Sequence, residues 1–158
     1  MKLSDLTAYN PITIQCHDNP DEDAIASGYA LYVYFQSIGK EVRFIYCGRN
    51  RIQKPNMLLM LEHLNIPISY IEDTRSFLEK EPGGQVQGLL ITTDCQYGAG
   101  NVTCLPAENV AIIDHHQVEI RDVEKSEINP HLGSCSTLVW SMLREAGYEI
   151  QDTKLIST

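Results

Sequence analysis

Short apolar runs recur along the chain, and most are followed by a stretch with the apolar spacing of a helix. Runs rich in β-branched and aromatic residues predict strands at residues 11–16, 42–47, 68–71, 88–93 and 110–113. Apolar residues at three- and four-residue spacing predict helices at 20–38, 55–64 and 134–146. Strands that alternate with helices form mostly parallel sheets, so the pattern predicts an α/β domain with helices on both faces.

Capping residues suggest where the predicted helices begin and end. Asn19 is a suitable N-cap for the first helix, and Gly39 and Gly147 are suitable stops for the first and last helices. The glycine-rich segment 94–109 is expected to be a loop, with room for a short helical piece. Residues 153–158 resemble the start of another helix, which is too short to form alone. We therefore expect a single, truncated domain.

Three of the predicted strands are followed by residues that commonly ligate metals. His17 follows the first strand, Asp94 follows the fourth, and Asp114, His115 and His116 follow the fifth. The carboxyl ends of parallel strands meet at one edge of a sheet, where α/β proteins bind their ligands. Three separate placements of Asp or His at the same edge predict a metal site.

The two aspartates that follow His17 suggest that this site holds two ions. Asp21 and Asp23 are expected in the first helical turn, where residues two apart point about 200° away from each other. They would each serve one ion, while Asp94 could bridge both and His115 could ligate the second. Imidazole and carboxylate together suit Mn²⁺. Two ions roughly 3.5–4 Å apart can clamp the oxygens of an in-line phosphoryl displacement.

Asp114 and His116 are candidates for roles beside the metal ligands, whereas the remaining histidines are expected elsewhere. His116 could donate to a phosphate oxygen or to the leaving group. Asp114 could orient His115 or the nucleophilic water. His63 is expected on a helix surface, and His131 in a loop, where it has a smaller chance of reaching a substrate.

Composition limits the function classes. The chain has 158 residues and a formal charge of −9, which argues against broad electrostatic binding of nucleic acid. Two divalent cations would cancel about four of these charges and could still attract a phosphate. The five cysteines lack C-x-x-C spacing and are expected to be reduced, mostly buried fillers. With no membrane-length apolar run and no signal peptide, we expect a cytoplasmic protein with no membrane partner.

Four sequence strings resemble the DHH phosphoesterase superfamily. They are HDNPDEDAIAS at 17–27, LLITTDC at 89–95, IIDHHQ at 112–117 and GSCSTLVW at 133–140. The order and approximate spacing of the strings match the family over nearly the whole chain, and the resemblance implies the DHH domain's α/β fold. One departure is Glu22, where members usually carry Gly or Pro.

The resemblance implies a manganese-dependent hydrolase, RecJ-like or oligoribonuclease-like, that uses two Mn²⁺ ions, with Mg²⁺ or Co²⁺ as substitutes. Its expected substrates are phosphodiester or phosphomonoester bonds of short oligonucleotides or small nucleotides. The ligands it implies are His17, Asp21 and Asp94 for one ion, and Asp23, Asp94 and His115 for the other. It also gives His116 a role in binding phosphate.

The resemblance also implies two elements that this sequence lacks. Family members carry a further Asp ligand after a helix like the one that begins at Thr153, and then a second, DHH-associated domain. We therefore expect residues 1–158 to be an N-terminal catalytic domain, incomplete at its C-terminus, with one ion bound well, the second weakly, and little turnover. Apolar surface exposed at that end could promote a homodimer.

Two other functions are compatible with the same residues. One is an inorganic pyrophosphatase of family II type, or an exopolyphosphatase, which differs from the first expectation in substrate only. The other is a nucleotide- or metal-sensing module without catalysis, which the full set of potential ligands makes less attractive.

Overall fold

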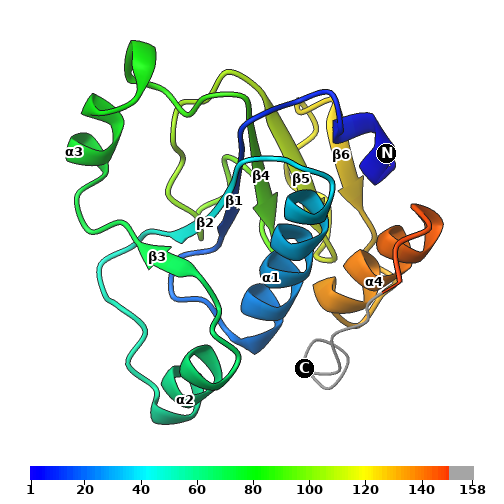
Figure 1. Ribbon diagram of the computed structural model, residues 1–158, viewed down its shortest axis with the longest axis horizontal. Coiled ribbons are helices and arrows are strands. Elements are labelled where there is room, and N and C mark those ends of the chain that lie inside the picture. The colour runs from blue at the N-terminus through cyan, green and yellow to red at the C-terminus, as the bar shows by residue number, and fades with distance from the viewer. Residues whose placement is uncertain (150–158) are drawn as a thin grey trace.

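The computed structural model describes residues 1–149 and contains one parallel sheet with helices around it (Figure 1). The strands are β1 (Ile12–Cys16), β2 (Val42–Tyr46), β3 (Ile68–Tyr70), β4 (Leu89–Thr93), β5 (Val110–Asp114) and β6 (Lys125–Ile128). The α-helices are α1 (Glu22–Ser37), α2 (Pro55–His63), α3 (Thr74–Glu79) and α4 (Cys135–Glu145). Two short 3₁₀ helices are η1 (Leu3–Leu6) and η2 (Pro82–Gly84).

The sheet has the strand order β3-β2-β1-β4-β5-β6, and every pairing in it is parallel. From β1 the chain moves outward to β3, and from β4 it moves outward to β6 on the other side. The order of the strands therefore reverses between β1 and β4. In doubly wound sheets this switch point opens a crevice at the carboxyl ends of the strands, which is the preferred place for a ligand.

The two faces of the sheet are covered unequally, and the alternation along β1 shows why. Ile12, Ile14 and Cys16 point to the larger core, which α1, α4 and part of α2 cover. Figure 1 shows α1 and α4 side by side in front of this face. The opposite face packs against α3 and the segment 85–107, in a smaller cluster of apolar residues. Helices therefore lie on both faces, as predicted.

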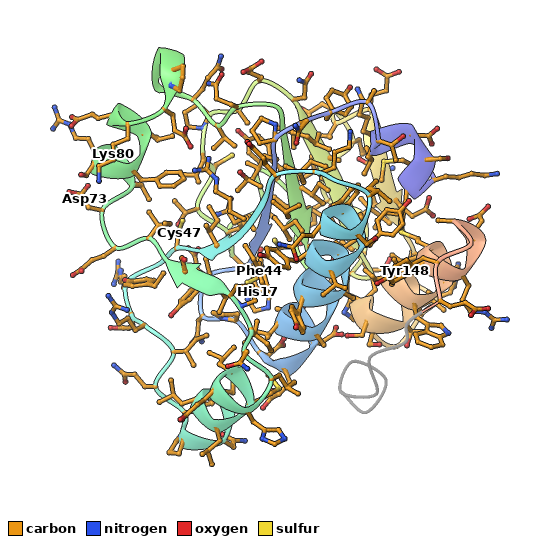
Figure 2. All side chains as sticks on the ribbon, in the orientation of Figure 1. His17, Phe44, Cys47, Asp73, Lys80 and Tyr148 are labelled. Carbon is orange, nitrogen blue, oxygen red and sulfur yellow. The ribbon has the colours of Figure 1, made fainter. Side chains whose placement is uncertain are left out.

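A glycine allows α1 to approach the sheet closely. Gly28 is buried on α1 against Phe44 of β2, which Figure 2 labels beside that helix. A Cβ atom at position 28 would lie 2.3 Å from Phe44 Cζ. Because that distance is far inside van der Waals contact, a larger residue would push α1 away from β2, and with it the loop that precedes the helix.

Two local expectations are wrong. Asn19 is not the N-cap of α1: its φ of 55° is left-handed, and the helix begins at Glu22 with Asp21 as its N-cap. The Asp21 side chain accepts a hydrogen bond from the Ala24 amide at 2.9 Å, which satisfies a donor of the first turn. In the helix predicted at 55–64 the apolar spacing places Leu58 inward, but its side chain is 46% exposed, because α2 turns Met57 toward the core instead.

Some elements were not predicted, and one predicted helix falls outside the described residues. The pattern did not predict α3, β6 or the two 3₁₀ helices. No helix forms within residues 94–109, which are all described. Gly39 and Gly147 do follow their helices with positive φ angles, as predicted. The helix expected at 153–158 lies outside the described residues. No helix in the described part of the chain is long and apolar enough to cross a membrane.

Candidate metal centre

Three strands bring the predicted ligands to one level at the switch point. Cys16 at the end of β1 pairs with Thr93 at the end of β4, and Thr93 also pairs with Ile113 of β5. The residues that follow these three are His17, Asp94 and Asp114. Parallel register across three neighbouring strands thus places side chains from distant parts of the sequence on a common edge.

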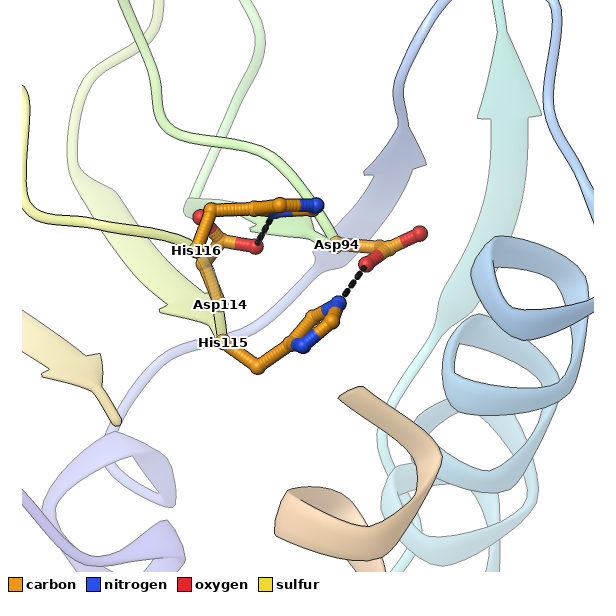
Figure 3. A group of neighbouring side chains, drawn as sticks. All are labelled: Asp94, Asp114, His115 and His116. Carbon is orange, nitrogen blue, oxygen red and sulfur yellow. Dashed lines mark hydrogen bonds and ion pairs between the residues drawn. The ribbon is translucent and has the colours of Figure 1, made fainter. Parts of the chain in front are cut away.

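Asp94 lies at the centre of the cluster and is only 2% exposed. Its Oδ2 lies 3.3 Å from His17 Nε2. Its Oδ1 lies 3.1 Å from His115 Nε2, a contact that Figure 3 shows. The left-handed φ of 60° at Asp94 turns the chain sharply at the end of β4. Each carboxylate oxygen therefore faces a different histidine, which is the arrangement that a bridging ligand requires.

The first predicted ligand set comes together in the structure. One atom each from His17, Asp21 and Asp94 lie within 4.8 Å of one another, and His17 Nε2 lies 3.7 Å from Asp21 Oδ1. His17 Nδ1 lies 2.8 Å from the carbonyl oxygen of Asp18. Because that oxygen can only accept, the proton belongs on Nδ1, and Nε2 presents its lone pair to the cluster.

The second predicted set also converges, on the other side of Asp94. His115 Nε2 lies 3.5 Å from Asp23 Oδ2 and 3.1 Å from Asp94 Oδ1. A further grouping of potential ligand atoms contains Asp94, Asp114, His115 and His116. The geometry differs from expectation at Asp114, because its Oδ1 contacts His116 Nδ1 at 2.7 Å and not the ring of His115 (Figure 3).

Asp23 has a second set of partners that the sequence did not reveal. Its carboxylate accepts hydrogen bonds from the amides of Cys135 and Ser136, both at 2.9 Å, and from Ser136 Oγ at 2.6 Å. These donors belong to the first turn of α4. Burial acts to raise the pKa of Asp23, but the hydrogen bonds from Ser136 and Cys135 stabilise the carboxylate and lower its pKa. Asp23 thus joins α4 to the candidate metal centre.

Asp23→Ala is expected to lower the free energy of unfolding of the metal-free chain by about 2 kcal/mol, because hydrogen bonds to a charged group are lost at a helix N-terminus. Urea denaturation in the presence of EDTA would measure the change. Asp73→Ala is the matched control, since Asp73 caps α3 through one exposed hydrogen bond to the Ser76 amide. The control variant should lower the free energy of unfolding by about 1 kcal/mol. Equal losses for the two variants would contradict the role of Asp23 in joining α4 to the candidate metal centre.

A buried glutamine behind the centre was also missed. Gln96, 3% exposed, donates to Asp114 Oδ2 at 2.8 Å and to the carbonyl of Gln117 at 2.9 Å. Its side-chain oxygen accepts from the amides of Glu119 and Ile120, both at 2.9 Å. All four hydrogen-bonding positions of the Gln96 amide are therefore used. The network ties the segment after the histidine pair to the loop that follows β4.

The charges of the centre favour a bound cation. Burial acts to lower the pKa of His17, but the contacts with Asp94 and with the Asp18 carbonyl outweigh it and raise the pKa to about 9. Without metal, His17 therefore carries a proton on Nε2 near neutral pH, and a bound cation would replace that proton and use the Nε2 lone pair. Burial raises the pKa of Asp94, and the nearby charges of Asp23 and Asp21 raise it further. Carboxylates that crowd one another in this way gain from a positive charge placed among them.

One buried atom tests whether a metal fits. Asp94 Oδ1 is inaccessible to solvent and makes no hydrogen bond with residues 1–149, although it lies 3.1 Å from His115 Nε2 and a buried carboxylate oxygen without a hydrogen bond is costly. The lone pair of such an atom is available to a cation. Carboxylate oxygens together with imidazole nitrogens form a donor set that Mn²⁺ accepts, so the residues present fit the predicted metal.

The other predicted residues lie where the pattern placed them. His63 and His131 are both exposed, and neither belongs to the groups of potential metal ligands found in residues 1–149. All five cysteines are free, and all except Cys104 are buried, as expected of small apolar fillers. Burial raises the pKa of Cys135 to about 12, so its thiol is a poor metal ligand.

Known proteins share both the sequence pattern and the fold. A probable manganese-dependent inorganic pyrophosphatase of Streptococcus pyogenes serotype M5 is 27% identical over 140 residues, which cover 85% of this chain and 41% of the relative. An exopolyphosphatase-related protein from Bacteroides fragilis superposes with a TM-score of 0.72 at 21% identity, over 92% of this chain and 43% of that one. A manganese-bound RecJ exonuclease gives a TM-score of 0.45 at 14% identity, over 94% and 39%.

The chain thus spans less than half the length of these relatives. The model of the DHH family, N-terminal domain, matches residues 11–157. This match contains every predicted ligand, from His17 to His116, and the three strands that present them. The family expected from the four sequence strings is confirmed, and the chain belongs to the DHH family through its N-terminal domain.

Proposed function

We propose that this chain is the catalytic domain of a manganese-dependent phosphoesterase that acts on short oligonucleotides or small nucleotides. The observation that carries the proposal is the position of Asp94, buried between His17 and His115 with one carboxylate oxygen that makes no hydrogen bond in the described part of the chain. Membership of the DHH family supports the same reaction class.

Two groups of residues would hold the ions. His17, Asp21 and Asp94 would hold one Mn²⁺, and Asp23, Asp94 and His115 the other. When bound, the ions would supply Lewis-acid stabilisation of the charge that develops on a reacting phosphoryl group. The protein residues fix the positions of these donors: Nδ1 of each ligating histidine faces a backbone carbonyl, Asp18 for His17 and Leu132 for His115.

His116 is suited to bind the substrate directly. Its side chain is 53% exposed at the edge of the centre, and Asp114, which is buried, holds Nδ1 at 2.7 Å. Burial acts to lower the pKa of His116, but the hydrogen bond to Asp114 raises it above its ordinary value. A larger share of His116 is therefore protonated near neutral pH, with Nε2 left to donate to a phosphate oxygen or to the leaving group.

The proposal predicts metal-dependent turnover by the whole protein. Addition of Mn²⁺ to protein stripped of metal with EDTA should start the hydrolysis of bis-p-nitrophenyl phosphate. The release of p-nitrophenolate measures the rate. His116→Ala should lower kcat by roughly 10²-fold, the usual contribution of a positioned proton donor. His131→Ala, which changes an exposed histidine outside the cluster, should leave kcat unchanged. A protein that binds Mn²⁺ and nucleotides but does not hydrolyse bis-p-nitrophenyl phosphate would instead be a sensing module.

Inorganic pyrophosphatase is the second candidate, and the Streptococcus relative named as a probable manganese-dependent enzyme of that kind favours it. The same centre could place a pyrophosphate across both ions. Phosphate release from pyrophosphate and nucleotide release from a diribonucleotide should be measured side by side under identical Mn²⁺ concentrations. A kcat/KM for pyrophosphate that exceeds the value for the dinucleotide by more than about 10³-fold would favour the second candidate; that factor is about 4 kcal/mol.

A further inference from the structure

The residue that follows His17 is held by hydrogen bonds to a loop far along the chain. The Asp18 amide donates to the Asn101 carbonyl at 2.9 Å. The Asp18 carboxylate accepts from the Thr103 hydroxyl at 2.7 Å, through Oδ2, and from the Thr103 amide at 3.2 Å, through Oδ1. Both the backbone and the side chain of Asp18 are therefore bound to the segment 101–103, although Thr103 lies 85 residues further along the chain.

The segment 101–103 is itself fixed to β1. Gln15, which is completely buried on that strand, donates from Nε2 to the Thr103 carbonyl at 2.8 Å. Val102 is only 6% exposed. The amide, hydroxyl and carbonyl of Thr103 are thus all hydrogen-bonded to Gln15 or Asp18, which lie on either side of residues 16 and 17. The loop after β4 cannot move without breaking contacts that flank His17.

A glycine on the neighbouring strand's loop confines Asp18 from a second direction. Gly48 follows β2 with a φ of 105°, and a Cβ atom there would lie 2.9 Å from Asp18 Cβ and 3.2 Å from Asp18 Cγ. Because a larger residue would collide with Asp18, only glycine allows this approach. The Asp18 side chain is therefore confined between Gly48 and Thr103.

The position of Asp18 bears directly on a proposed metal ligand. The Asp18 carbonyl accepts a hydrogen bond from His17 Nδ1 at 2.8 Å, while His17 Nε2 lies 3.3 Å from Asp94 Oδ2. The partner of one ring nitrogen fixes the rotation of an imidazole and thereby the direction of the other nitrogen. Asp18 itself belongs to neither group of potential metal ligands found in residues 1–149.

We propose that Asp18 is a positioning residue for the ion that His17 would hold: its side chain, bound to Thr103, fixes the carbonyl that orients the His17 ring. This inference rests on the proposed function, whose ligands include His17. Loss of such an outer contact typically weakens metal binding about 10–100-fold. The effect should reach one ion only, because Nδ1 of His115 faces the Leu132 carbonyl, which lies outside this set of contacts.

Mn²⁺ binding to the whole protein tests the assignment, measured from the electron paramagnetic resonance signal of free Mn²⁺. His17→Ala identifies the ion that His17 holds, because this variant should lose it. Asp18→Ala should raise the Kd of that ion about 10-fold and leave the Kd of the other ion within threefold. Asp18→Asn should keep both Kd values within threefold of the wild type, since its Oδ1 can accept from the Thr103 amide and its Nδ2 can donate to Thr103 Oγ1.

Thr103→Val tests the same contact from its other end. It removes the hydroxyl and keeps the branched shape, so it should raise the same Kd, by less than Asp18→Ala because the Thr103 amide still donates. Thr7→Val is the matched control, since it removes a hydroxyl that donates to the Ser4 carbonyl at 2.9 Å, ahead of β1. This control should leave both Kd values unchanged.

Two results would overturn the assignment while Mn²⁺ binding by the wild type stands. One is an unchanged Kd in Asp18→Ala or, if that variant does not fold, in Thr103→Val. The other is an Asp18→Asn protein that binds Mn²⁺ as weakly as Asp18→Ala, which would show that the charge of residue 18 matters and not its hydrogen bonds. A wild type that binds no Mn²⁺ would overturn the proposed function, and this inference with it.

Discussion

Asp94→Asn is expected to lower kcat/KM for every Mn²⁺-dependent reaction of the whole protein by roughly 10³-fold, the scale of losing a central electrostatic contact. The two carboxylate oxygens of Asp94 face different histidines, at 3.3 Å from His17 and 3.1 Å from His115. Asparagine would keep one of these oxygens and replace the other with an NH₂ donor. Since both proposed ions share Asp94, no other residue of the centre can substitute for it.

A binding measurement separates this role from a general loss of structure. At a Mn²⁺ concentration about 100 times its Kd, binding should stabilise the 158-residue chain by about 2.7 kcal/mol and raise Tm by roughly 5–10 °C. Asp94→Asn should fold without metal but show no such rise. Asp122→Asn, a change of an exposed carboxylate, should keep the full rise. A metal-dependent Tm in the Asp94 variant would remove the basis for its bridging role.

The part of this centre that could be predicted from sequence depends on local patterns. The β1, β4 and β5 strands are short apolar runs in which almost every residue is buried, so their hydrophobicity is visible without knowledge of the fold. His17 and Asp94 then follow directly from the rule that parallel strands present ligands at their carboxyl ends. Strand order was not needed, because any parallel arrangement places these ends on the same edge.

The elements that were missed have weak local signals. All four residues of β6 are only half-buried, and its sequence, KSEI, is mostly polar because the strand lies at the edge of the sheet. The α3 helix has six residues and no fully buried side chain. At the start of α1, Asn19 and Asp21 are both good N-caps by residue type, and only the left-handed backbone at Asn19 decides between them.

The contacts that position the centre are long-range, and no local pattern reveals them. Asp23 and the amides of α4 are more than 100 residues apart in sequence, and they meet because α1 and α4 pack side by side on the same face of the sheet. The string at 133–140 indicates the start of a helix, but it does not indicate that the amides of this helix bind the Asp23 carboxylate. No sequence signal distinguishes Gln96 from the other polar residues of the glycine-rich segment 94–109.

Gln96→Leu is expected to lower the free energy of unfolding by about 3 kcal/mol, because an unsatisfied buried polar group costs roughly 1–3 kcal/mol. Four groups lose their partner: the Asp114 carboxylate, the Gln117 carbonyl, and the amides of Glu119 and Ile120. The loss is smaller than the sum of four such costs, because the segment 117–120 can move outward and its backbone groups can then form hydrogen bonds with water. Urea denaturation would measure the loss, and Gln36→Leu at an exposed position on α1 should change stability by less than about 0.5 kcal/mol.

A conservative variant separates the stability of the segment from the orientation of His116. In Gln96→Glu, the retained oxygen can still accept from Glu119 and Ile120, but the donor to Asp114 is lost and a second carboxylate lies beside it. We therefore expect Gln96→Glu to keep the hydrogen bonds from Glu119 and Ile120 that Gln96→Leu loses, yet to lower kcat about 10-fold at nearly unchanged KM, because repulsion between two buried carboxylates displaces Asp114 from His116. Normal kcat in Gln96→Glu would show that Asp114 holds His116 in place without Gln96.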